Sequence, residues 1–215
     1  MTSDSQHLNQ HAWRLALSLS VTTIVFNIIE GGISTVFGAR DGSLALFGFG
    51  IDSFAEVASG SGVVLMILRF MNHLSTTRSL AEKRALQITS ISFFLISGAL
   101  LFAGLSSLWT GSTPTTTLPG VIISLVSIAI MLILVHFKCR VGAALSSDPI
   151  LADARCGEVC IYMSLVLLGS SLLYFLSGIR CADSIGAIAL AVLSFKEGRG
   201  TWRSSQSSGN SSCCC

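Results

Sequence analysis

Six long apolar stretches, separated by shorter polar segments, make up most of this chain of 215 residues. Hydrophobic residues account for 51% of the sequence and charged residues for only 11%, and the mean hydropathy is +0.74. This composition excludes an ordinary soluble domain, because about 20 mainly apolar residues suffice to cross a bilayer as a helix. We therefore expect an all-α polytopic membrane protein with six transmembrane helices. The predicted spans are Ala12–Phe37, Leu44–Leu68, Leu86–Trp109, Leu118–Phe137, Pro149–Leu176 and the shorter Ala182–Phe195.

The positions of the Lys and Arg residues orient these helices. With a cytosolic N-terminus, only Arg40 and Arg180 fall in outside loops, whereas inside segments hold Arg14, Arg69, Arg78, Lys83, Arg84, Lys138, Arg140, Lys196, Arg199 and Arg203. Both termini are thus expected in the cytosol. The chain then divides into a cytosolic N-terminal tail (residues 1–11), a six-helix transmembrane domain (12–199) and a Ser/Cys-rich cytosolic tail (200–215). No cleavable signal peptide or sorting signal is evident, so the plasma membrane is the expected location, with an intracellular vesicle membrane as the alternative.

Two carboxylates interrupt the second apolar stretch. Asp52 and Glu56 are four residues apart, which places them on one face of a helix. A charge at membrane depth costs roughly 2.5–3.5 kcal/mol on insertion scales, and such residues usually mark an ion or proton path. The alternative is a buried, hydrogen-bonded pair with a structural role. Glycines at positions 48, 50, 60 and 62 lie before and after the two acids and favour close packing of a neighbouring helix.

The fifth apolar stretch repeats this spacing with thiols, because Cys156 and Cys160 are also four residues apart. Two helices that each offer such a pair supply four donors, which is the number in a tetrahedral metal site. Two thiolates with two carboxylates favour Zn²⁺ or a softer ion such as Cd²⁺ over Mg²⁺ or Mn²⁺. The alternative for the cysteines is that they are small buried side chains without a ligand role.

These segments resemble the cation diffusion facilitators, also called cation efflux proteins, over roughly residues 12–199. The resemblance rests on GSLALFGFGIDSFAEVASG, LADARCGEVCIYMS and CADSIGAIALAV. In that family the second helix carries an acidic pair, which Asp52 and Glu56 match. The fifth helix usually has a His followed four residues later by an Asp, and Cys156 and Cys160 stand at those positions. The resemblance implies a six-helix, usually dimeric metal/proton antiporter with its site between the second and fifth helices, here expected to lack the family's usual cytosolic C-terminal domain.

Other polar residues in the spans are secondary candidates. Asn27 and Glu30 share a face of the first helix and are expected to act as a proton relay or to support the metal ligands, or else to form an interhelical hydrogen bond. Asp183 matches a family Asp in the sixth helix, with a capping role at the interface as the alternative. Asp153 and Arg155 are expected to pair with neighbouring side chains near the cytosolic face.

The function predicted from these features is transport of a divalent metal cation, zinc or a related soft metal, exported from the cytosol in exchange for protons. The expected partners are the lipid bilayer, metal cations, protons and a second copy of the chain. We expect no enzymatic activity, no nucleic-acid partner and no permanently bound cofactor. The alternatives are a non-transporting metal-binding regulatory protein and a proton-coupled transporter of small organic molecules. Cys213–Cys215 are interpreted as a metal-capturing patch, a palmitoylation site or inert thiols.

Overall fold

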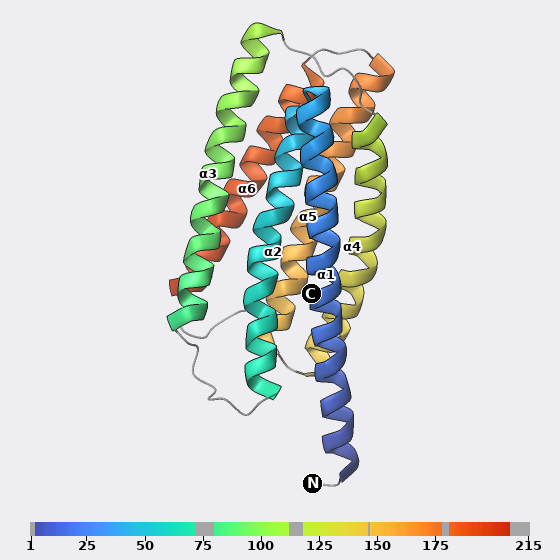
Figure 1. Ribbon diagram of the computed structural model, residues 1–215, viewed down its shortest axis with the longest axis vertical. Coiled ribbons are helices and arrows are strands. Elements are labelled where there is room, and N and C mark those ends of the chain that lie inside the picture. The colour runs from blue at the N-terminus through green and yellow to red at the C-terminus, as the bar shows by residue number, and fades with distance from the viewer. Residues whose placement is uncertain (1–2, 72–79, 112–117, 146, 178–180, 207–215) are drawn as a thin grey trace.

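A computed structural model describes residues 3–71, 80–111, 118–145, 147–177 and 181–206 of the chain. The described residues form six helices and no strand, which confirms the predicted all-α fold (Figure 1). Successive helices alternate in direction, so the start of α1 and the end of α6 lie toward the same end of the bundle (Figure 1). The helices are α1 (Ser3–Asp41), α2 (Leu44–Met71), α3 (Leu80–Thr110), α4 (Leu118–Ala144), α5 (Asp148–Ser177) and α6 (Ala182–Gln206).

Each of the six described helices is longer than the apolar stretch that predicted it. α1 begins at Ser3, within the predicted N-terminal tail, and α6 continues to Gln206, into the predicted Ser/Cys-rich tail. Hydropathy marks the part of a helix that suits a bilayer, whereas the backbone hydrogen bonds of a helix continue into polar sequence. Cys213–Cys215 lie outside the described residues.

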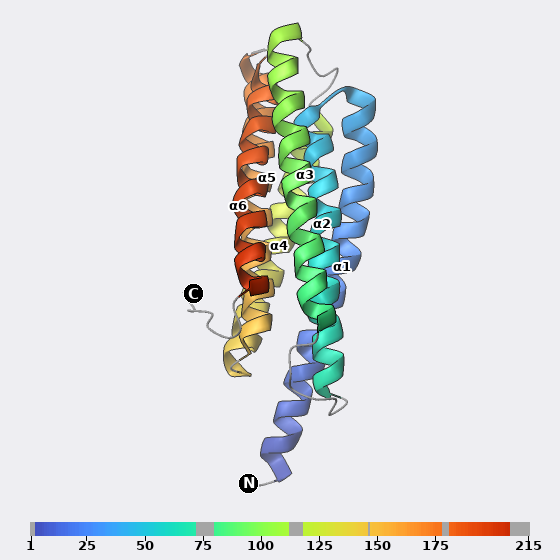
Figure 2. The same ribbon diagram turned by 90° about the vertical axis from the view of Figure 1, so that its left-hand side faces the viewer.

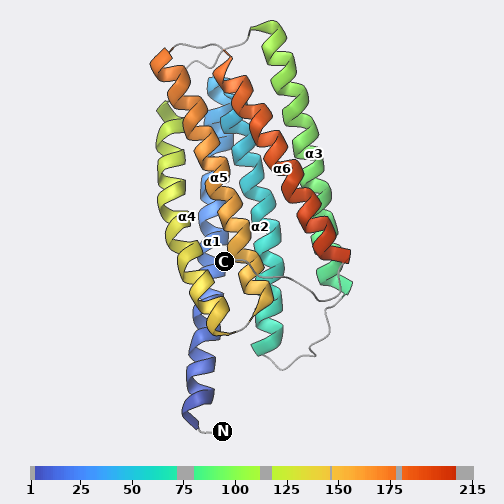
Figure 3. The ribbon, with the colours of Figure 1, turned by 180° about the vertical axis from the view of Figure 1, so that it is seen from behind.

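Within the described residues, the helices long and apolar enough to cross a membrane are α1 to α5. α6, the shortest predicted span, is not among them; it carries Asp183 near its start and Lys196, Glu197 and Arg199 farther along. α6 nevertheless packs along α3 as part of the same bundle (Figure 3). Many large apolar side chains face outward, including Leu95, Phe102 and Trp109 of α3. Such a surface suits lipid rather than water, in keeping with a multi-pass membrane protein.

The helices pack most closely in three pairs, α1 with α2, α3 with α6, and α4 with α5 (Figures 1 and 2). Gly50 lets α1 and α2 approach, since a Cβ atom there would lie 2.6 Å from the backbone nitrogen of Thr35. This bears out the packing role predicted for Gly50. Gly62 has open space beside it, so the same role is wrong for that residue.

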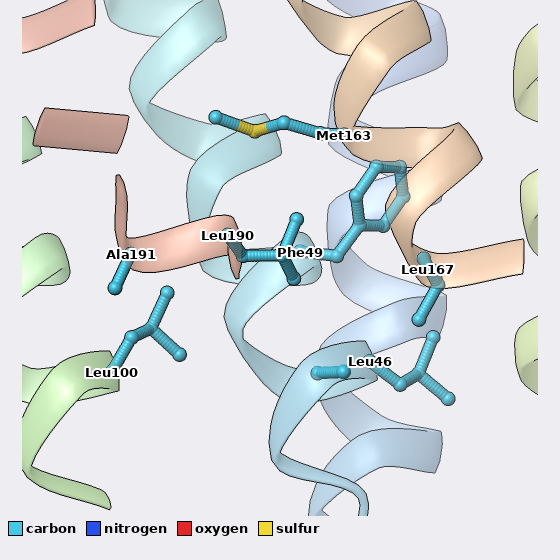
Figure 4. Close-up of a cluster of buried hydrophobic side chains, with 8 residues drawn as sticks. Leu46, Phe49, Leu100, Met163, Leu167, Leu190 and Ala191 are labelled. Atoms are coloured by element: carbon cyan, nitrogen blue, oxygen red, sulfur yellow. The ribbon is translucent and has the colours of Figure 1, made fainter. Parts of the chain in front are cut away.

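Two apolar clusters lie along the bundle, before and after the acids of α2. The Phe49 cluster joins α2, α3, α5 and α6 and comprises Ala45, Leu46, Phe49, Leu100, Met163, Leu167, Leu190 and Ala191 (Figure 4). The Ile67 cluster joins α1, α2, α4 and α5 and comprises Ala16, Ile67, Val141 and Ile150. Because Asp52 and Glu56 lie between Phe49 and Ile67 in α2, the acids occupy the segment between two apolar layers.

Candidate metal site

The two acids of α2 are both buried but bind different helices. Asp52 is 3% exposed and accepts a hydrogen bond of 3.0 Å from Ser194 Oγ of α6. Glu56 is 7% exposed and accepts a hydrogen bond of 2.8 Å from Asn27 Nδ2 of α1. The one-turn spacing therefore does place both side chains inside the bundle, and neighbours on opposite sides fix their orientations.

The two cysteines of α5 lie beside these acids. The Cys160 thiol is buried and interacts with the Glu56 carboxylate. The Cys156 sulfur lies 4.0 Å from Glu197 Oε1 of α6. The structure thus brings Glu56 and Cys160 together, and it turns Cys156 toward α6.

α1 contributes a line of buried polar side chains that faces this region. Successive members are three or four residues apart, which keeps them on one helix face. Glu30 accepts a hydrogen bond of 3.3 Å from Ser53 Oγ of α2 on one carboxylate oxygen, and its other oxygen, Oε1, is buried without a partner. We call this line the α1 polar seam; its members are Ser20, Thr23, Asn27, Glu30 and Ser34.

An ion pair closes one end of the α1 polar seam. Lys138 Nζ of α4 lies 2.8 Å from Asp153 Oδ2 of α5, with side chains 3% and 7% exposed. Ser20 Oγ donates a further hydrogen bond of 3.1 Å to the same oxygen. The prediction that Asp153 pairs with a neighbour is confirmed. The side chain of Lys138, a residue predicted for a cytosolic segment, is buried inside the bundle, where Asp153 holds its ammonium.

A small cavity of about 10 Å³ lies among α1, α2, α4 and α5. This is roughly the space for one water molecule. No three His, Cys, Asp or Glu side chains of the described residues are close enough in this conformation to hold one ion together. The set of Asp52, Glu56, Cys156 and Cys160 therefore stays a prediction that requires these side chains to converge. The cavity is lined by Thr23, Asn27, Glu56, Gly60, Met131, Asp153, Cys156 and Gly157.

Asp183 lies away from the acids of α2. Its carboxylate accepts hydrogen bonds from Ser43 Oγ, at 2.5 Å, and from the backbone nitrogen of Leu44, at 2.8 Å. Leu44 is the first residue of α2, so Asp183 caps the start of that helix. Eleven residues separate Asp183 from Ser194, or about 16 Å along α6. The hydrogen bonds of Asp183 thus agree with its alternative role as a cap. Its role as a proton relay remains a prediction, and none of these contacts supports it.

Sequence reasoning missed two residues of α6 that face the site, Ser194 and Glu197. They are three residues apart and so share a helix face, on which Ser194 bonds Asp52 and Glu197 approaches Cys156. A buried serine in an apolar stretch gives little signal. Glu197 stands between Lys196 and Arg199, and this charged sequence is typical of a solvent-exposed end of a helix.

The comparison with protein families agrees with this arrangement. The family model for the cation efflux transmembrane domain matches residues 20–208. The chain belongs to the cation efflux family. It is accordingly a multi-pass integral membrane protein of a family that transports metal cations, and the matched region includes every residue placed in the site above. No curated protein gives a significant match to the chain.

Proposed function

We propose that this cation efflux protein exports a divalent metal, zinc or a related soft metal such as cadmium, from the cytosol in exchange for protons. The observation that carries the proposal is that Glu56 of α2 and Cys160 of α5 are both buried in the bundle and interact there. A carboxylate beside a thiol is a donor set suited to Zn²⁺ and Cd²⁺ and poorly suited to Mg²⁺. Asp52 and Cys156, one turn away on the same two helices, complete the proposed set.

Proton exchange follows from the chemistry of these donors. Carboxylates and thiols bind a metal in their deprotonated forms, so binding releases protons and protonation releases the metal. Glu30 interacts electrostatically with Glu56 and is the proposed relay. The Phe49 cluster and the Ile67 cluster lie on either side of the acids. A movement that opens one cluster at a time would expose the ion to one side at a time.

The remaining parts of the proposal concern assembly and location. The family resemblance favours a homodimer, and the expected membrane is the plasma membrane, with an intracellular vesicle as the alternative. The activity is transport without covalent chemistry, so the protein is proposed not to be an enzyme.

Proteoliposomes test this function directly. Purified protein is reconstituted with a metal-sensitive dye inside, a pH gradient is imposed, and Zn²⁺ and Cd²⁺ influx is recorded. The wild-type protein should move metal at a rate that depends on the gradient, and Asp52→Ala with Glu56→Ala should reduce the flux to that of empty liposomes. Glu158→Gln is the matched control, since Glu158 is an acid of α5 that does not line the cavity.

Two results would count against the proposal. Unchanged flux in the double variant would show that the site is wrong. Metal binding without any flux in the wild-type protein would favour the non-transporting regulatory function instead.

A further inference from the structure

The small cavity gathers a set of cation-binding groups that differs from the predicted site. Two carboxylates, one thiol and one amide line it, namely those of Glu56, Asp153, Cys156 and Asn27. Asp52 and Cys160 are not among its lining residues. Glu56 and Cys156 therefore belong to both sets, whereas Asp153 and Asn27 belong to the cavity alone.

Asn27 gives the cavity an oxygen without a partner. The residue is 1% exposed, and its Nδ2 atom donates to Glu56, but its Oδ1 atom is buried with no hydrogen-bond donor. Leaving a buried acceptor unsatisfied costs about 1–3 kcal/mol, and native structures rarely do so without a reason. A cation in the cavity would supply the missing positive partner.

Lys138 already acts as a positive partner at this cavity. Its ammonium holds Asp153 at 2.8 Å, and its charge also acts on Cys156. Charges of this kind inside a protein are stable only when paired, so Asp153 is neutralised by Lys138 whenever no other cation is present. The pair also explains why the ligands are not assembled for metal, since Lys138 holds one of them.

We propose that Asn27, Glu56, Asp153 and Cys156 form a first binding site for the transported divalent cation, and that Lys138 is a tethered cation that the metal must displace from Asp153. This deepens the proposed function and rests on it. Asp153 lies seven residues, or about 10 Å, nearer the start of α5 than Cys160. With that start in the cytosol, an ion reaches Asp153 first and then moves one helical turn to the set of Asp52 and Cys160, while Glu56 and Cys156 remain its ligands.

A double-mutant cycle on the full-length purified protein tests this site, with Zn²⁺ affinity measured by competition against a chromogenic chelator. Asp153→Asn removes a ligand and should weaken binding by at least about tenfold. Lys138→Met removes the competitor and should strengthen binding by a similar factor. In the Asp153→Asn background, Lys138→Met should no longer strengthen it. Glu158→Gln, again an acid of α5 outside the cavity, should bind as the wild type does.

Folding is checked by size-exclusion chromatography, because removing one member of a buried pair destabilises many proteins. If either single variant fails to fold, Lys138→Arg replaces the cycle. Arginine keeps the charge and binds carboxylates with two parallel hydrogen bonds, so it should compete better and weaken Zn²⁺ binding. Unchanged affinity in Lys138→Arg, or in a folded Asp153→Asn, would overturn the inference.

The two proposals fail differently. If Asp153→Asn binds normally while Glu56→Gln and Cys160→Ser lose affinity, the first site is wrong and the transport site stands. If the wild-type protein neither binds nor moves Zn²⁺ or Cd²⁺, the proposed function itself is wrong.

Discussion

The α3–α6 interface and the α1 polar seam are both rich in buried polar groups, yet they satisfy them differently. In the former, Ser90 donates to the carbonyl of Gly198, Ser97 to that of Ala191, and Ser184 to Ser107. Within the described part of the chain, every buried side-chain nitrogen or oxygen without a partner is on α1: Asn27 Oδ1, Glu30 Oε1, Ser34 Oγ and Thr35 Oγ1.

This difference separates packing from function. A serine that bonds a facing helix holds two helices together and leaves nothing for a ligand. A buried oxygen with no protein partner needs an explanation, such as a water or an ion that binds there. Of these residues, Asn27 and Glu30 interact with Glu56, and among the described residues none lies on α3. The functional part of the bundle is therefore expected to be the α1, α2 and α5 side.

The largest effect is expected at Glu56, which contacts both α1 and α5. Glu56→Gln keeps the size of the side chain and its ability to accept from Asn27, but removes the charge. Removing a side chain that hydrogen-bonds a metal ligand typically lowers metal affinity or activity by about 10- to 100-fold. Removing the ligand itself should therefore lower metal flux by more than about 100-fold. Flux near the wild-type rate, from protein that elutes as the wild type does, would contradict the assignment of the metal site to the α1, α2 and α5 side.

The next effect concerns the choice of ion. Cys160→Ser replaces a soft sulfur with a harder oxygen beside Glu56, so the preference for Cd²⁺ over Zn²⁺ should fall by about tenfold, or 1.4 kcal/mol. Competition between the two metals for the purified protein measures this ratio. Cys139→Ser is the matched control, since Cys139 of α4 lies outside the cavity and the proposed ligand set. An equal loss for both ions would indicate a packing role for Cys160.

Substitution of Glu30 should affect the coupling of metal transport to proton movement more than it affects metal binding. Glu30→Gln keeps the hydrogen bond from Ser53 available but removes a group that carries a proton. Equilibrium metal affinity should remain close to that of the wild type, whereas the flux driven by a pH gradient should fall several-fold. Parallel dye records of metal and proton movement separate the two quantities. A loss of affinity as large as that of Glu56→Gln would make Glu30 a ligand instead of a relay.

The smallest effect is expected on the α3–α6 side. Ser97→Ala removes the hydrogen bond to the Ala191 carbonyl and should lower the free energy of unfolding by about 0.6–1 kcal/mol, with metal affinity unchanged. Thermal unfolding in detergent measures the first quantity and chelator competition the second. Weakened metal binding in this variant would show that the serine interface also shapes the site.

Particular residues show how far sequence alone reached. The helices and the burial of Asp52, Glu56 and Cys160 were predictable, because long apolar runs and four-residue spacings are local patterns. The 3–4 spacing of the α1 polar seam was also present in the sequence, although only Asn27 and Glu30 stood out from its serines and threonine. Partners between distant segments were not predictable. Nothing in the sequence links Ser194 to Asp52 or Glu197 to Cys156, since which faces meet depends on how six helices pack.

The burial of Lys138 could not be predicted from the sequence either, because it also depends on a partner on another helix. Lys138 follows an apolar run, and hydropathy therefore ends the span just before it. Only the position of Asp153 on the neighbouring helix makes burial of the ammonium favourable. A pair of opposite charges inside a bundle thus looks, in sequence, like two unrelated residues near a membrane edge.

We propose above all that α2 and α5 hold the metal together, through carboxylates and thiols. X-ray absorption spectroscopy of the Zn²⁺-loaded, purified full-length protein tests it most directly. We expect sulfur ligands at about 2.3 Å beside oxygen ligands at about 2.0–2.2 Å, and we expect the double variant Cys156→Ser with Cys160→Ser to lose the sulfur signal. A wild-type spectrum with only oxygen and nitrogen ligands, or a sulfur signal that survives both substitutions, would contradict it.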